Sequence, residues 1–86
     1  MRVVFRKRIC FLVDDVYLRR IMELPFCPPL GMLVIDGDWE CVVTELVWDE
    51  DKKYVEAWAE ADVTTRWEAS ATSTTAWIDR GWEQDE

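Results

Sequence analysis

The stretch Tyr54-Val55-Glu56-Ala57-Trp58-Ala59-Glu60-Ala61-Asp62 alternates strictly between two kinds of side chain. One parity holds only small apolar residues, and the other holds three carboxylates and two aromatic rings. Because the side chains of a strand alternate between its two faces, this pattern predicts a β-strand whose small apolar side packs inward. The opposite side would present acidic and aromatic groups to water, which favours a surface that binds a partner.

Four more stretches have strand-like patterns, and turn residues separate them. Asp14-Asp15 is a plausible hairpin turn, Asp36-Gly37 is typical of a tight hairpin, and residues 49–53 form a charged turn. All three prolines lie within residues 25–31, where proline cannot donate to a β-ladder and the sheet must pause. The expected strands cover residues 3–13, 16–24, 32–35, 39–48 and 54–62.

This order predicts a mostly β fold. We expect a small five-stranded antiparallel curved sheet, or an SH3-like or OB-like barrel, with a short C-terminal helix. Residues 1–63 would form the sheet, and residues 64–86 a polar loop, a helix within residues 73–82 and an acidic tail, all packed on one domain. Thr72 or Ser73 would cap the helix and Gly81 would end it.

Six tryptophans are many for a chain of 86 residues, and three of them lie near the C-terminus. Trp67, Trp77 and Trp82 have two interpretations: they close the bottom of the barrel within one molecule, or they bury aromatic surface between two copies in a homodimer. Packing within the monomer is the preferred interpretation.

Charge is distributed unevenly along the chain, whose net charge is −8. Residues 1–24 hold six basic against three acidic residues, whereas residues 25–86 hold four basic against fifteen acidic residues. A chain of this sign repels nucleic acid and anionic membranes at long range and attracts basic surfaces. The acidic charge also has a simpler interpretation, as the means of keeping a small protein soluble.

The residues that most catalytic and metal sites require are missing. Histidine is absent, and the three cysteines, Cys10, Cys27 and Cys41, form no C-x-x-C pair. We therefore expect no enzymatic activity, no metal and no cofactor. Free thiols favour a reducing, cytoplasmic location. No apolar run approaches the roughly 20 residues of a membrane span, so we expect no membrane association.

The leading hypothesis is a non-enzymatic module whose acidic, aromatic face binds a basic, nucleic-acid-binding surface of another protein. The competing interpretation is a solvated sheet face whose aromatic rings the C-terminal helix covers. The predicted partner-binding set comprises Trp48, Asp49, Glu50, Asp51, Tyr54, Glu56, Trp58, Glu60 and Asp62.

Two alternatives belong to other classes. A small barrel could bind nucleic acid through the basic N-terminal hairpin, although the net charge argues against it, and the chain could be a structural subunit of an assembly. In size, acidity and displayed aromatics the chain resembles the small inhibitor proteins of phages and mobile elements, including certain anti-CRISPR proteins. That resemblance is one of overall character and aligns no residues. The basic alternative would use Arg6, Arg8, Arg19 and Arg20.

Overall fold

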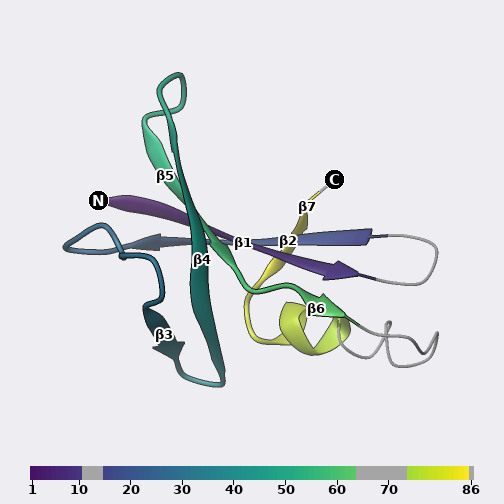
Figure 1. Ribbon diagram of the computed structural model, residues 1–86. Coiled ribbons are helices and arrows are strands. Elements are labelled where there is room, and N and C mark those ends of the chain that lie inside the picture. The colour runs from purple at the N-terminus through teal and green to yellow at the C-terminus, as the bar shows by residue number, and fades with distance from the viewer. Residues whose placement is uncertain (11–14, 64–73, 86) are drawn as a thin grey trace.

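The computed structural model describes residues 1–10, 15–63 and 74–85 and has a mostly β fold with one short helix (Figure 1). The predicted fold class is therefore confirmed. The helix covers residues 74–79. The strands are β1 (Arg2–Cys10), β2 (Asp15–Glu23), β3 (Leu33–Asp36), β4 (Trp39–Asp49), β5 (Tyr54–Ala59), β6 (Asp62–Val63) and β7 (Glu83–Asp85).

The strands form one curled, half-barrel sheet in the order β3-β4-β5-β1-β2-β7, with β6 paired to the far end of β1 (Figure 1). Strand β1 lies in the interior of this order. Its antiparallel neighbour is β2, but its other neighbour β5 runs parallel to it, with Val3 opposite Val55 and Arg6 opposite Trp58. A purely antiparallel sheet was expected. The parallel pair arises because the β4–β5 hairpin returns to the first strand of the chain.

Alternation along β1 explains which side of the sheet is buried. Val3, Phe5 and Ile9 have no exposed surface, and they lie on the same parity as the equally buried side of β5. This side is called the inner face, and the opposite side the outer face. Lys7 shares the parity of the buried residues and is itself buried, with 1% of its surface exposed. Burial of about 25 cal/mol per Å² of apolar surface is the main stabilising contribution of such a face.

Three tryptophans fill the open side of the curled sheet. Trp39 of β4 lies 5.1 Å from Trp82 and 6.4 Å from Trp77, between ring centroids, and Phe5 lies 6.3 Å from Trp39. Trp77 and Trp82 also contact each other edge to face at 5.4 Å. The prediction that these two tryptophans pack within the monomer is confirmed. Trp67 lies outside the described residues.

The C-terminal segment differs from the expected free tail. Gly81 has φ +97° just after the helix, as the predicted helix end requires. The chain then buries Trp82 and adds β7 to the edge of β2, with Glu83 opposite Arg19 and Asp85 opposite Tyr17. Burial of Trp82 brings the following residues to the sheet edge, so their backbone pairs with β2 while the side chains of Glu83 and Gln84 stay exposed. The proposed caps Thr72 and Ser73 lie outside the described residues.

Two strand boundaries also differ from expectation. The stretch 54–62 is not one strand, because Glu60-Ala61 interrupts it and Asp62 begins β6. Residues 11–13, expected to extend the first strand, lie outside the described residues. Within the described part of the chain, no helix has the length and apolar character needed to cross a membrane.

Candidate partner-binding face

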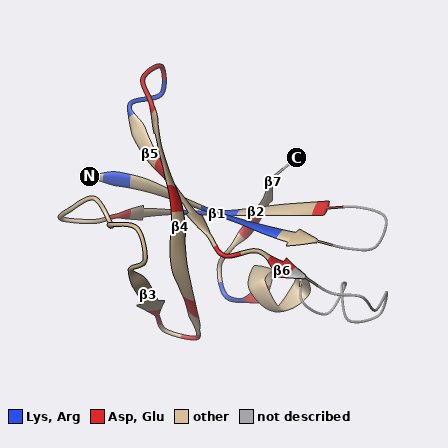
Figure 2. Ribbon diagram, viewed as in Figure 1, with Lys and Arg blue, Asp and Glu red and all other residues tan. Residues whose placement is uncertain are grey.

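The outer face of the β4–β5 hairpin brings together part of the predicted partner-binding set. The two strands pair so that Glu45 lies opposite Trp58, Val47 opposite Glu56 and Asp49 opposite Tyr54. A β-bulge between Val43 and Glu45 shifts the alternation of β4, which turns Glu45 to the same side as Trp58. Figure 2 shows Asp and Glu residues along this hairpin and Lys and Arg residues on neighbouring β1. The result is an acidic and aromatic strip, interrupted by Val47 and called here the hairpin face.

The hairpin tip presents one tryptophan to solvent, but not on the predicted face: the β-bulge places Trp48 opposite Val55, on the other side of the hairpin from Trp58. Trp48 is 54% exposed, and its indole Nε1 donates a 2.7 Å hydrogen bond to Glu50, which also binds Lys53. The hydrogen bond from Lys53, which has the larger effect, and the one from Trp48 both lower the pKa of the Glu50 carboxyl. Asp49 stabilises the turn because its Oδ1 accepts the backbone N–H of Lys52. Asp51 is exposed at the same turn. The tip is therefore an ordered, exposed combination of one aromatic ring and three carboxylates.

The middle of the hairpin face is partly covered by basic residues. Glu56 pairs with Arg6 at 3.3 Å, and both side chains are more than four-fifths buried. The Arg6 guanidinium also lies 5.9 Å from the centre of the Trp58 ring. Tyr54 is half-buried, and the Lys52 ammonium lies 5.9 Å from its ring centre. The Glu56 carboxylate is therefore already paired with Arg6 within the protein.

The end of the predicted strand turns away from the hairpin face. Asp62 lies 3.3 Å from the Nζ of Lys7 and accepts a 3.2 Å hydrogen bond from the indole of Trp77. Lys7 also donates to the backbone oxygen of Glu60 at 3.0 Å and lies 4.6 Å from the ring centre of Trp77. Asp62 thus connects the buried lysine to the aromatic core. The side chain of Glu60 is exposed beyond the end of β5.

A hollow of about 340 Å³ opens beside Trp58, where four strands meet. Tyr17 of β2 approaches Trp58 of β5 edge to face at 6.2 Å, and Glu45 of β4 lies on the wall. Alternation along the sequence assigned Trp58 to the site, but Tyr17 and Glu45 join it through pairing between distant strands. The outward parity of Tyr17 was the available signal, whereas Glu45 has the inward parity of Trp39 and Val43 in the sequence and is turned outward only by the bulge. The lining residues are Arg8, Tyr17, Thr44, Glu45, Trp58, Ala59 and Ala61.

The four arginines of the nucleic-acid alternative each have an acidic neighbour. Arg6 pairs with Glu56, and the hydrogen bonds that Arg8 donates to Asp15, at 2.7 and 3.2 Å, raise the pKa of its guanidinium. Arg20 lies on the opposite side of β2 from Arg19. The two remaining pairs are Arg19 with Glu83 at 3.4 Å and Arg20 with Asp36 at 3.8 Å. These acidic neighbours offset much of the positive charge that the basic hairpin would otherwise present.

The described residues hold neither a metal-ligand cluster nor an activated thiol at Cys41. Across residues 1–10, 15–63 and 74–85, no three histidine, cysteine or acidic side chains lie close enough together to hold a metal ion. Burial raises the pKa of the Cys41 thiol to about 11, which keeps it protonated and unreactive near neutral pH.

Comparison with known proteins gives no relative from which a role can be transferred. A scan against protein-family models, a search of curated proteins and a search of solved structures found no match to this chain, so its interpretation rests on the geometry of the outer face.

Proposed function

We propose that this protein is a non-enzymatic module that binds a basic surface of another protein through the hairpin face. The anchor is the hollow beside Trp58, which receives a lysine or arginine side chain of the partner. The acidic tip extends the contact along the hairpin, whereas Trp48, opposite Val55, projects from the other side of the hairpin. A partner groove that binds nucleic acid has the required charge, and occupying it would inhibit that partner.

The observation that carries this proposal is the composition of the hollow. Two aromatic rings, Tyr17 and Trp58, stand at 88° to each other beside the Glu45 carboxylate. No basic side chain among the described residues pairs with Glu45, so its charge is available to a ligand. A cation near an aromatic face gains about 0.5–2 kcal/mol, and a carboxylate adds a charge-assisted hydrogen bond. Together these groups suit an ammonium or guanidinium.

Trp58 already accommodates one cation, the guanidinium of Arg6, within the protein. Arg8 also lines the hollow, but its two hydrogen bonds to Asp15 offset its charge. The exposed carboxylates of Asp51 and Glu60, and the chain's net charge of −8, attract a basic partner at long range. These features support a protein partner more than nucleic acid, whose phosphates the same charges repel.

The exposed thiol of Cys27 supports a cytoplasmic location as part of this proposal. A free, exposed cysteine persists in reducing compartments, whereas oxidising ones favour its conversion to a disulfide.

The decisive experiment reverses one charge inside the hollow and one outside it. Tagged protein captures its partner from nuclease-treated lysate at low salt, and the affinity of the purified partner is then measured by calorimetry. Glu45→Lys should weaken binding about tenfold or more, because it places a cation against the incoming cation. Glu40→Lys makes the same change in net charge on the same strand, at an exposed position that does not line the hollow, and should have a much smaller effect.

Equal losses in the two variants would show that only net charge matters and would overturn the anchor hollow. Recovery that depends on intact nucleic acid would overturn the choice of a protein partner. Reversing Glu56 and Asp62 would be a poor test, because these residues pair with Arg6 and the buried Lys7, and their loss would destabilise the fold.

A further inference from the structure

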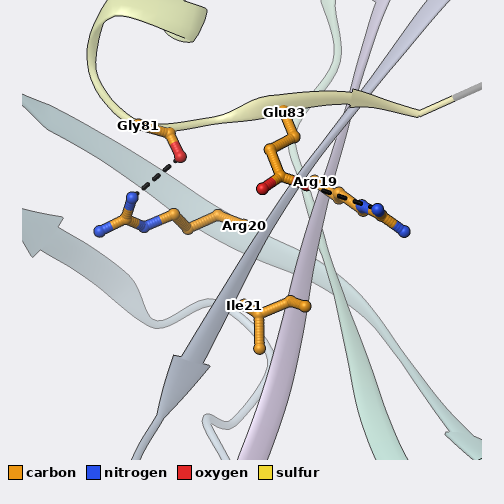
Figure 3. A pocket seen from close by; sticks show the side chains of 5 residues that line it. All are labelled: Arg19, Arg20, Ile21, Gly81 and Glu83. Carbon is orange, nitrogen blue, oxygen red and sulfur yellow. Dashed lines mark hydrogen bonds and ion pairs between the residues drawn. The ribbon is translucent and has the colours of Figure 1, made fainter.

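A second, smaller pocket lies away from the hairpin face, where β7 leaves the edge of β2. It has a volume of about 120 Å³ and is lined by Arg19, Arg20, Ile21, Gly81 and Glu83. Figure 3 shows the two arginine side chains extending from β2 in opposite directions, so that they flank the pocket. In the same view, Glu83 points from β7 toward β2. The pocket is therefore bounded by two guanidinium groups and one carboxylate.

The arginines retain unused hydrogen-bond donors. The Nε atoms of Arg19 and Arg20 are both buried, and neither has an acceptor among the described residues. Arg20 Nη1 donates a 2.9 Å hydrogen bond to the backbone oxygen of Gly81, and Arg19 makes only a long, 3.4 Å contact to Glu83. A buried N–H of a charged group without an acceptor is costly. An anionic group in the pocket would satisfy these donors.

The neighbouring backbone is also unpaired. Strand β2 continues to Glu23, but its pairing with β7 ends at Arg19. Met1 and Leu24 exchange backbone hydrogen bonds, so alternation directs the N–H and C=O of Ile21 and Glu23 away from β1. No described strand occupies that edge of β2, and the Ile21 side chain beside it is 53% exposed. Such an edge accepts an extended peptide.

We propose that an extended peptide adds to β2 over Ile21–Glu23 and places its C-terminal carboxylate between Arg19 and Arg20. The charges determine the direction of the peptide. An antiparallel peptide ends near Arg20 and brings its carboxylate to the pocket, whereas a parallel one would bring its positively charged amine there. The peptide would lie end to end with β7 on the same edge of β2, beyond the point where the chain turns inward at Gly81. This site uses none of the residues of the hollow beside Trp58 and is independent of it.

The pocket depends on glycine at position 81. Gly81 has φ +97°, and a Cβ built there would overlap the guanidinium of Arg20. A side chain at this position would therefore displace Arg20 from one side of the pocket. Glu83 competes with a ligand for Arg19, so removing its charge should improve binding.

The experiment compares two libraries of peptides with four randomised C-terminal residues, one with a free carboxylate and one with a C-terminal amide. Enrichment is expected only from the free-carboxylate library. For a selected peptide, Arg19→Gln should weaken binding about tenfold, and Glu83→Gln should strengthen it several-fold. Glu45→Lys, in the separate hollow, should leave this affinity unchanged. Amide shifts in NMR spectra should centre on Ile21, Gly81 and Glu83.

Several outcomes would overturn the proposal. Equal enrichment of amidated peptides would exclude carboxylate recognition, and no enrichment from either library would exclude the site. Sodium acetate alone, titrated against sodium chloride, tests a small anion: saturable shifts with acetate but no peptide binding would show an anion pocket without strand addition. Dimerisation without peptide, detected by light scattering, would instead assign the edge of β2 to a second copy of the chain.

Discussion

The C-terminal aromatic cluster and the hairpin tip use the same residue type in opposite ways. Trp82 is 1% exposed and packs edge to face against Trp39 and Trp77, whereas Trp48 is 54% exposed and contacts Glu50 through its indole N–H. The cluster closes the core of a small sheet, where every buried ring contributes to stability. The tip adds little to that core. An exposed tryptophan on a protruding hairpin is instead available for contact with a partner.

The largest expected effect comes from truncating one tryptophan in each region. Trp82→Ala should destabilise the protein by about 3–5 kcal/mol, because it leaves a cavity among packed rings. Trp48→Ala should cost less than about 0.5 kcal/mol, since its ring is largely solvated. Urea unfolding followed by circular dichroism measures both.

If Trp82→Ala does not fold, Trp82→Phe provides the comparison, because it retains an aromatic ring and should unfold at a lower urea concentration than the wild type. Similar midpoints for the Trp82 and Trp48 variants would remove the distinction between a structural and a displayed tryptophan.

A smaller loss of stability is expected when the ion pair between Lys7 of the core and Asp62 of the predicted partner-binding set is broken. Asp62→Asn leaves Lys7 buried without its counter-charge and should cost about 2 kcal/mol, a value reduced because the Asp62 side chain is 39% exposed. Replacing both residues, Lys7→Met with Asp62→Asn, should be less destabilising than Asp62→Asn alone. Chemical denaturation of the four proteins in a double-mutant cycle measures this coupling. An additive result would show that the pair does not interact.

The smallest predicted effect is a change of stability with pH, which has opposite directions in the core and at the hairpin tip. The thiol of Cys41 has its pKa raised from 9.0 to about 11 by burial, so the folded state holds its proton above the pH at which the unfolded chain loses it. Stability from this group is complete below pH 9 and falls as pH rises to 11, by about 1.4 kcal/mol at pH 10. Cys41→Ala should reduce this loss, whereas Cys27→Ala, at an exposed thiol, should not.

Urea midpoints between pH 8 and pH 10.5 measure this dependence. Equal alkaline slopes for wild type and Cys41→Ala would contradict a core thiol as the cause. At the hairpin tip the pKa of Glu50 is lowered, so the pH dependence runs the other way. The stability that Glu50 contributes is present above the ordinary carboxyl pKa and is lost as the carboxylate becomes protonated in acid.

Local patterns were sufficient for several elements of the fold. Alternation in Tyr54–Ala59 gave the correct buried parity, and the tight turn between β3 and β4 lies at Gly37-Asp38, one residue beyond the predicted Asp36-Gly37, with φ +60° at Gly37. Gly81 likewise follows the C-terminal helix in a left-handed conformation. These features depend on neighbouring residues and on steric limits of the backbone, so the sequence reveals them directly.

Alternation along the sequence was less successful in predicting the surroundings of the partner-binding set. Parity placed Glu56 and Trp58 on one face, but it could not show that Arg6 covers both or that Asp62 turns to Lys7. Lys7 was the one residue that broke the apolar parity of β1. A charged residue on a buried parity signals a buried partner, but the partner lies 55 positions away in the sequence. Only the fold identifies it.

The sequence by itself determined the mostly β class, five of the seven described strands, the acidic balance and the absence of histidine, because these depend on composition and short-range pattern. Tertiary structure alone decided which charges remain available, through the parallel pairing of β1 with β5 and the return of β7 to β2. These pairings join residues far apart in the chain, and their stability comes from a shared core that no local pattern encodes. The same pairings place Tyr17 and Glu45 beside Trp58 and leave the edge of β2 unoccupied beyond Arg19 within the described part of the chain.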